Sequence, residues 1–268
     1  MSLSAFTIIK NANIYSYPII ESIKSLLPYV DEYIVNTDSE DKDGTFQLLK
    51  DNFGGEKKVK IIRVKWEDNI GTLFLSSQTN LTLGACSGDW IFYLQGDEIL
   101  RDGDGEKIKD WIERAEAENA QGITFNYQHF AMRPDLIRKT YINGGDCYNK
   151  ELRLFKNNGQ LMSFGDGQSF CFIGEFQDPR GPQPALHHLD KFIESNLEIY
   201  HYGWLKNPEK FLAKKKYLDT FYQVSEPGRK ENIPDKNGKY LFSLDSLKEF
   251  TGQHPKIMAK YLEEWKNV

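Results

Sequence analysis

Asp97 is the sharpest chemical feature of this sequence, because it comes shortly after an apolar run. The run 90–94 (WIFYL) has the composition of a buried strand, and 95–98 (QGDE) comes immediately after it. A carboxylate at the end of a central strand could bind a hard divalent cation, which would take its other oxygen ligands from a diphosphate and from water. The alternative is that this acid caps the segment that follows.

His201 could complete such a cation site. It lies near the end of a second apolar run, 197–202 (LEIYHY), and precedes Gly203 and Trp204. A neutral imidazole is a metal ligand, and manganese accepts nitrogen more readily than magnesium does. Judged from the residue alone, a buried core histidine with hydrogen-bond partners is the favoured alternative.

The elements that must position these residues alternate through the first half of the chain. β-branched and aromatic runs predict strands at 6–10, 33–35, 59–64, 90–94 and 122–127. Apolar residues at helical spacing predict helices over 20–30, 44–53, 73–85 and 108–115. This order predicts an α/β fold with a mostly parallel sheet and helices on both faces. Ligands of such sheets bind beyond the carboxyl ends of the strands, so the polar residues there are site candidates.

The second half of the chain is less regular. Residues 132–183 are rich in Gly, Asp, Asn and aromatic side chains, which predicts loops and a small antiparallel annex with a strand at 152–155. The run 197–202 predicts another strand, and 208–221 predicts a lysine-rich helix. Two short C-terminal helices are expected at 244–250 and 255–266.

Composition and missing motifs exclude several classes of protein. The 268 residues carry a formal charge of −5, which argues against an electrostatic nucleic-acid binder. The longest apolar run falls far short of the ~18–20 residues that a membrane-spanning helix needs. Three cysteines without a C-x-x-C pair suit a reducing cytoplasm. Neither a G-x-G-x-x-G after the first strand nor a P-loop motif is present, which argues against both of those nucleotide folds.

Seven segments carry a resemblance to a known family. They are FTIIKNA (6–12), TDSEDKDGT (37–45), GDWIFYLQGDE (88–98), NYQHF (126–130), ELRLFKN (151–157), GDGQSF (165–170) and YHYGW (200–204). In this order they resemble the family 2 glycosyltransferases of GT-A fold, and more narrowly the soluble bacterial branch related to lipopolysaccharide-core glycosyltransferases. The likeness runs from about residue 5 to 216. It implies a GT-A mixed sheet flanked by helices, with a small antiparallel annex and C-terminal helices.

The resemblance also implies a domain organisation and an activity. A GT-A domain is expected over 1–216, with its nucleotide-sugar half at about 1–130 and its acceptor half at about 131–216, followed by a C-terminal helical extension over 217–268. The implied reaction is an inverting, hexosyltransferase-type transfer from a nucleotide-diphosphate-sugar donor to a saccharide or lipid-linked acceptor, assisted by Mn²⁺ or Mg²⁺. The implied setting is cell-surface polysaccharide or lipopolysaccharide synthesis in the cytoplasm. The lysine run 214–216 is usually a solvated helix face, but it could meet an anionic lipid-linked acceptor at the inner membrane.

Site residues follow from the same resemblance. The metal-binding acid of the family's D-x-D motif falls on Asp97, and Gln95 stands where the motif has its first Asp. The downstream metal-side histidine falls on His201. The acid that contacts the nucleobase maps to Asp38, or to Asn36 if the turn is aligned differently. Asn11, after the first strand, is a further donor-binding candidate.

Two catalytic roles remain to be assigned. Arg153 could clamp the phosphates with its guanidinium group, or it could pair with a structural carboxylate. The acceptor hydroxyl needs a general base on the far side of the sugar from the diphosphate. Asp166, in the glycine-rich GDG loop, is the first candidate, followed by Asp146 and then Glu151.

Two other functions stay open. A non-catalytic nucleotide-sugar-binding protein would keep the pocket without the chemistry, and Gln95 is the residue in its favour. A sugar-1-phosphate nucleotidyltransferase shares the layered fold, but it should carry a glycine-rich, arginine-containing phosphate loop after the first strand. Residues 10–13 (KNAN) offer no such loop.

Overall fold

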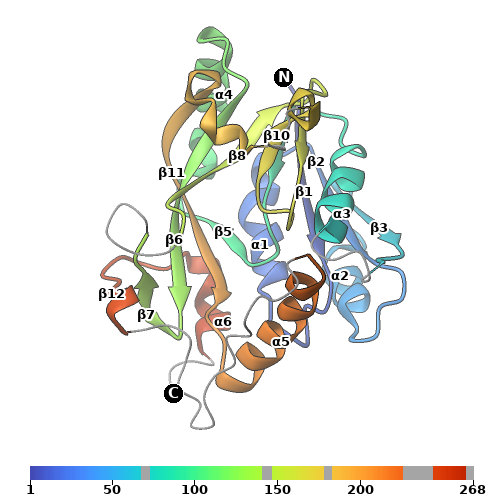
Figure 1. Ribbon diagram of the computed structural model, residues 1–268, viewed down its shortest axis with the longest axis vertical. Coiled ribbons are helices and arrows are strands. Elements are labelled where there is room, and N and C mark those ends of the chain that lie inside the picture. The colour runs from blue at the N-terminus through green and yellow to red at the C-terminus, as the bar shows by residue number, and fades with distance from the viewer. Residues whose placement is uncertain (68–72, 141–146, 178–182, 226–243, 264–268) are drawn as a thin grey trace.

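The fold is seen in a computed structural model of the chain. It describes residues 1–67, 73–140, 147–177, 183–225 and 244–263. A ten-stranded mixed sheet forms its centre, and the strand order along the main path is β12-β7-β6-β8-β4-β1-β2-β3 (Figure 1).

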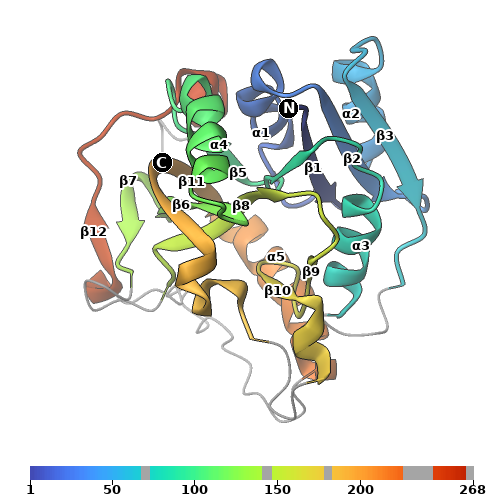
Figure 2. The same cartoon turned by 90° about the horizontal axis from the view of Figure 1, so that it is seen from above.

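One half of the sheet is parallel. β1 (Leu3–Ile9) lies between β2 (Glu32–Asp38) and β4 (Trp90–Tyr93), and β3 (Val59–Val64) pairs with β2 at the edge. β1, β2 and β4 are almost entirely buried, as expected for parallel strands that helices cover on both faces. α1 (Ile19–Leu26), α2 (Thr45–Phe53) and α4 (Ile108–Ala117) cover one face, and α3 (Leu73–Leu83) lies on the other (Figure 2).

The other half of the sheet is largely antiparallel. β8 (Lys150–Lys156) pairs antiparallel with β4 and with β6 (Gly122–Ala131). β11 (Phe192–Trp204) runs parallel to β6 and antiparallel to the short β5 (Glu98–Leu100). β7 (Arg133–Arg138) and β12 (Leu247–Glu249) extend this half, while β9 (Leu161–Ser163) and β10 (Phe170–Phe172) form a separate two-stranded sheet. The expected mixed sheet with flanking helices and a small antiparallel annex is confirmed.

Three sequence-based expectations about elements need correction. The strand expected at 33–35 continues to Asp38, so 36–38 belong to β2 instead of a turn. The strand expected at 152–155 joins the main sheet as β8 instead of the annex. The helix expected at 244–250 is wrong: a 3₁₀ turn, η7 (Leu244–Ser246), leads into β12, which pairs with β7. So short a segment is more stable on the edge of β7, where its backbone gains cross-strand hydrogen bonds.

The remaining C-terminal elements pack on the sheet. α5 (Pro208–Ser225) follows β11. It continues beyond residue 216, the expected end of the GT-A domain. η8 (Lys256–Met258) and α6 (Ala259–Glu263) place Met258, which is fully buried, against Phe130 and Tyr202. Other 3₁₀ turns are η1 (Leu27–Tyr29), η2 (Gly105–Lys107), η4 (Ile173–Gln177), η5 (Ala185–His187) and η6 (Leu189–Lys191). Within the described ranges, every helix is too short or too polar to cross a membrane.

Candidate functional site

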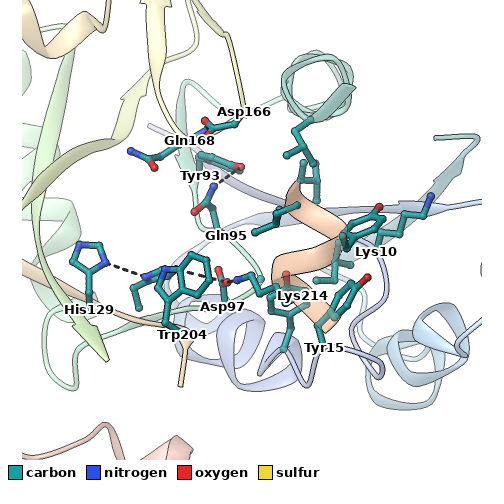
Figure 3. A pocket seen from close by; sticks show the side chains of 18 of the residues that line it. Lys10, Tyr15, Tyr93, Gln95, Asp97, His129, Asp166, Gln168, Trp204 and Lys214 are labelled. Atoms are coloured by element: carbon teal, nitrogen blue, oxygen red, sulfur yellow. Dashed lines mark hydrogen bonds and ion pairs between the residues drawn. The ribbon is translucent and has the colours of Figure 1, made fainter. Parts of the chain in front are cut away.

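A cavity of about 610 Å³ lies at the carboxyl ends of β1 and β4 (Figure 3). The ends of β6 and β11, the 165–168 loop, α3 and α5 also contribute to its wall. Its volume suits a small-molecule ligand. The lining includes Lys10, Gln95, Asp97, Asp166, His201 and Lys214.

Asp97 is held by the turn that ends β4. The Glu98 carboxylate accepts a hydrogen bond from the backbone N–H of Gln95 (3.0 Å), which closes the turn. The backbone N–H of Tyr202 donates to the carbonyl of Asp97 (2.8 Å), which fixes the turn to β11. Gly96 allows close packing here, because a Cβ at this position would lie 2.8 Å from Cδ1 of Ile9.

The Asp97 carboxylate meets two nitrogen-bearing side chains inside the cavity. Its Oδ2 lies 3.6 Å from Nε2 of His201 and 3.2 Å from Nζ of Lys214. The Lys214 ammonium also donates to the carbonyl of Gly203 (3.0 Å) and lies 4.8 Å from the ring centres of Tyr17 and Trp204. The two aromatic faces and the carboxylate together stabilise this buried ammonium group.

Gly203 leaves a space between the two candidate ligands. A Cβ on Gly203 would lie 2.4 Å from Nε2 of His201 and 2.6 Å from Oδ2 of Asp97. The absence of a side chain therefore keeps open a small cradle that faces a carboxylate oxygen and an imidazole nitrogen at once.

The charges around Asp97 keep it ionised. Burial by itself raises the pKa of the Asp97 carboxyl, but Lys214, His201 and Lys206 lower it more, and the net pKa lies well below the ordinary value. Burial also lowers the pKa of Lys214, which Asp97 partly counters. Lys206 is a second buried lysine; it donates to the carbonyl of Ser16 (3.2 Å) and lies over the ring of Tyr17.

These residues fit a divalent cation. Oδ2 of Asp97 and Nε2 of His201, which lie 3.6 Å apart, are the two side-chain atoms that would hold such an ion. An imidazole beside a carboxylate is a donor set that manganese accepts. No three His, Cys, Asp or Glu side chains gather as a metal cluster in the described part of the chain. Two protein ligands would therefore leave the remaining positions to donor phosphates and water.

Asp38 lies at a second, neighbouring cavity of about 290 Å³. Lys10, Asn11 and Trp66 also line it, so Asn11 and Asp38 lie beside the same space. Lys10 Nζ pairs with Asp38 Oδ2 (2.9 Å), and the backbone N–H groups of Glu40 and Trp66 donate to Oδ1. Burial raises the pKa of Asp38, but these hydrogen bonds and Lys10 reverse the shift, so the net pKa is lowered.

Asn36 lies elsewhere. Its side chain is fully buried under α3, where its amide donates to Oε1 of Gln78 (3.1 Å) and to Oγ1 of Thr82 (2.9 Å). Trp66 Nε1 donates to the side-chain oxygen, Oδ1, of Asn36. Of the two alignments considered for the nucleobase contact, the structure places Asp38 at a cavity and uses Asn36 to join β2 to α3.

Arg153 does not line the cavity. Its guanidinium is fully buried and donates to both carboxylate oxygens of Glu98, at 2.9 and 3.2 Å. A further N–H donates to the carbonyl of Gln168 (2.8 Å). Of the two roles considered, the structure shows the pairing with a structural carboxylate, and Arg153 connects the turn after β4 to the 165–168 loop.

Among the three acids considered as general base, Asp166 lines the cavity. Its Oδ1 accepts the backbone N–H of Gln168, and the glycines on either side adopt positive φ angles of 60° and 78°. Glu151 is buried behind the loop, where it accepts hydrogen bonds from Gln168 and Ser169, and burial raises its pKa. Asp146 lies outside the described residues.

The sequence model of glycosyl transferase family 2 matches residues 4–173. The chain belongs to glycosyl transferase family 2. A search of curated protein sequences gives no match. The family match does not identify the lipopolysaccharide-core branch, which stays a prediction.

Similar solved structures include three of TarS from S. aureus. The TarS crystal structure has a TM-score of 0.46 and 12% identity, over 86% of this chain and 41% of that chain. TarS 1–349 in complex with UDP-GlcNAc has a TM-score of 0.46 and 12% identity, over 83% and 67%. TarS 1–349 in complex with UDP has a TM-score of 0.43 and 13% identity, over 83% and 66%. This family 2 chain thus spans less than half of the TarS chain of the first structure.

Sequence patterns alone do not single out several residues that lie at or beside this cavity. Lys214 belongs to the lysine run expected to form a solvated helix face, but it is buried, and within that run only Lys216 is exposed. Lys214 lies three residues after the buried Phe211 and four residues before Leu218, which lines the cavity. Residues at this spacing share one face of a helix, so the spacing indicates that Lys214 faces inward. His129 lies inside the segment 126–130 and Gly203 inside 200–204, so both belonged to segments that carried the family resemblance.

Proposed function

We propose that this chain transfers a sugar from a nucleotide-diphosphate-sugar donor to an acceptor hydroxyl, with inversion at the transferred carbon. The observation that carries the proposal is the grouping of Asp97, His201 and Lys214 at the strand-end cavity, with Asp166 elsewhere on its wall. Membership of family 2 supports the reaction class.

The donor occupies both cavities in this proposal. The nucleobase lies in the smaller one, beside Asn11 and Asp38, and the diphosphate lies near Asp97 and Lys214 in the larger one. Asp97 and His201 would hold Mn²⁺ or Mg²⁺, and this cation would supply Lewis-acid neutralisation of the charge on the leaving diphosphate. Lys214 adds a fixed positive charge to the same region, and Gln95 contributes an amide where a second carboxylate would otherwise face the phosphates.

Asp166 is the proposed general base. In Figure 3 it lies with Gln168 on one side of Gln95, and Asp97 and Lys214 lie on the other side. A base there could accept the acceptor's proton while the diphosphate leaves on the opposite side of the sugar. Arg153 and Glu98 act behind the cavity wall, by holding the 165–168 loop against the turn that carries Asp97.

The proposed acceptor is a saccharide or lipid-linked saccharide of the cell surface, and the resemblance to lipopolysaccharide-core enzymes is its support. Contact with a lipid surface through the whole lysine run is not part of the proposal. Lys214 is buried beside Asp97, and Lys215 pairs with Asp219 (2.8 Å).

A thermal-shift screen tests the donor site. Purified chain is heated with UDP, GDP, CDP or TDP, each with Mn²⁺ or with EDTA. A ligand that binds only the folded chain raises the midpoint, by an increment that grows with its concentration over Kd. The proposal expects one nucleotide to stabilise the chain, more strongly with Mn²⁺. If no nucleotide shifts the midpoint, the proposal fails.

Donor hydrolysis separates a transferase from a nucleotide-sugar-binding protein, the alternative that Gln95 favours. Water can take the place of the acceptor hydroxyl in a transferase, so slow release of the nucleotide diphosphate from the donor is expected. A chain that binds the donor tightly and never hydrolyses it would instead be a binding protein.

A further inference from the structure

His129 and His201 form a histidine pair at the cavity wall. They lie opposite each other on the adjacent parallel strands β6 and β11, so both side chains project from the same face of the sheet. Their Nδ1 atoms are 2.9 Å apart, and the two rings cross at 80°. His129 is 2% exposed, and its Nε2 lies 2.8 Å from the backbone carbonyl oxygen of Tyr148.

The hydrogen bonds of this pair determine where the protons lie. A carbonyl oxygen only accepts, so Nε2 of His129 must carry a proton and donate it to Tyr148. Neither partner of the His129 ring is a carboxylate, and a charged imidazolium buried in this way would be costly. The ring is therefore neutral, and its Nδ1 is an acceptor. The short contact between the rings then requires that His201 donates from Nδ1.

The consequence falls on the other nitrogen of His201. With Nδ1 committed as a donor, Nε2 is the nitrogen that can offer a lone pair, and it faces Oδ2 of Asp97 across the cradle at Gly203. Two lone pairs that face each other at 3.6 Å repel unless a metal ion or a second imidazole proton lies between them. Metal-binding histidines commonly donate their other N–H to a protein acceptor, which orients the ring.

We infer that His129 is a positioning residue, which fixes the proton of His201 on Nδ1 and so presents Nε2 to a cation on Asp97. This inference rests on the proposed function, because the cation is the one that would assist departure of the diphosphate. His129 contacts the cation only through His201.

Two substitutions separate this role from simple packing. His129→Asp keeps a pure hydrogen-bond acceptor next to Nδ1 of His201, whereas His129→Leu has similar volume and no acceptor. Isothermal titration with Mn²⁺ alone, without nucleotide, measures the cation site directly. We expect His129→Leu to weaken Mn²⁺ binding by ~10–100-fold, the usual effect of losing such a partner, and His129→Asp to retain most of the affinity. Equal Mn²⁺ affinity in His129→Leu and the native chain would overturn the inference.

A second measurement uses the native chain without metal, so it does not depend on the folding of a variant. Nitrogen-15 NMR of labelled histidine at pH 8 distinguishes protonated from unprotonated ring nitrogens, with His201→Asn to assign the signals. We expect Nδ1 of His201 to be protonated and Nε2 to be unprotonated. Protonation at Nε2, alone or together with Nδ1, would overturn the inference even if Mn²⁺ binds. If the NMR result is as expected but Mn²⁺ does not bind the native chain, the proposed cation site fails and the proton assignment stands.

Discussion

Arg153 and Glu98 form a fully buried ion pair directly beside the residue that carries the proposed chemistry. Both oxygens of Glu98 accept from the guanidinium group, and Tyr127 donates its hydroxyl hydrogen to the same carboxylate (2.8 Å). The rings of Tyr93 and Tyr127 lie 5.3 and 5.4 Å from the guanidinium carbon. This arrangement explains why Glu98 follows Asp97: one acid faces the cavity and the next one anchors the turn.

Arg153→Met should destabilise the chain strongly, because it leaves Glu98 buried without its cation. We expect a loss of about 3–5 kcal/mol in the free energy of unfolding, measured by urea denaturation. Arg133→Met is the matched control, since Arg133 forms an exposed ion pair with Asp135 and its loss should change the free energy of unfolding far less. The double variant Arg153→Met/Glu98→Gln should recover part of the loss. A small effect of Arg153→Met on unfolding, combined with weaker nucleotide binding, would instead support the phosphate-clamp role.

Gly203→Ala should block the cation cradle. The new methyl group would fall 2.4 Å from Nε2 of His201 and 2.6 Å from Oδ2 of Asp97, so both side chains would have to move. We expect Mn²⁺ binding, measured by titration calorimetry, to be lost. Gly55→Ala is the control, because a Cβ there would meet nothing within 4 Å. Native-like Mn²⁺ affinity in a folded Gly203→Ala chain would place the cation elsewhere.

Lys214→Met should separate the roles of the ammonium and the cation. Loss of a charge-assisted contact to the diphosphate should weaken nucleotide binding in EDTA by roughly 10–100-fold. Affinity for Mn²⁺ alone should not fall, because a positive charge beside Asp97 has been removed. Lys216→Met, on the exposed face of the same helix, should change neither quantity. Nucleotide affinity in EDTA that is equal in the two variants would show that Lys214 does not bind the diphosphate.

Asp166→Asn should keep donor binding and lose turnover. The asparagine can still accept the backbone N–H of Gln168, so the loop should keep its shape. Without a carboxylate to accept the proton, we expect donor hydrolysis or transfer to fall by ~10²-fold or more. Glu151→Gln is the comparison. If the loss appears in Glu151→Gln and not in Asp166→Asn, the base is Glu151.

The parallel half of the fold could be predicted because its central strands are continuously apolar and its half-exposed edge strand, β3, is rich in β-branched residues. The run 90–94 reads as continuous apolar residues, and the limits of β3 match the prediction of 59–64. The antiparallel half could not be predicted, because its strands pair with segments that lie far away in the sequence. β12 is a clear example: nothing within 244–250 indicates that the edge of β7, more than a hundred residues earlier, supplies its hydrogen bonds.

The candidate site could be predicted where a residue lies at or just after the end of an apolar strand. Asp97 follows one and His201 lies near the end of another, and the structure brings them within 3.6 Å. Lys214 could not be recognised in the same way, because it becomes buried only when α5 packs against Tyr17 and Trp204. Arg153 has no local signal that separates a phosphate ligand from an ion-pair partner. Only its burial against Glu98 does so.

The central claim is that the carboxylate of Asp97 binds a cation that helps to hold the donor diphosphate. Titration calorimetry of Asp97→Asn with the nucleotide found in the thermal-shift screen, in Mn²⁺ and in EDTA, tests it most directly. Asp110→Asn, at an exposed position on α4, is the control. We predict that Mn²⁺ strengthens nucleotide binding in the native chain and in Asp110→Asn, and that this gain disappears in Asp97→Asn. An equal Mn²⁺-dependent gain in all three proteins would contradict the account.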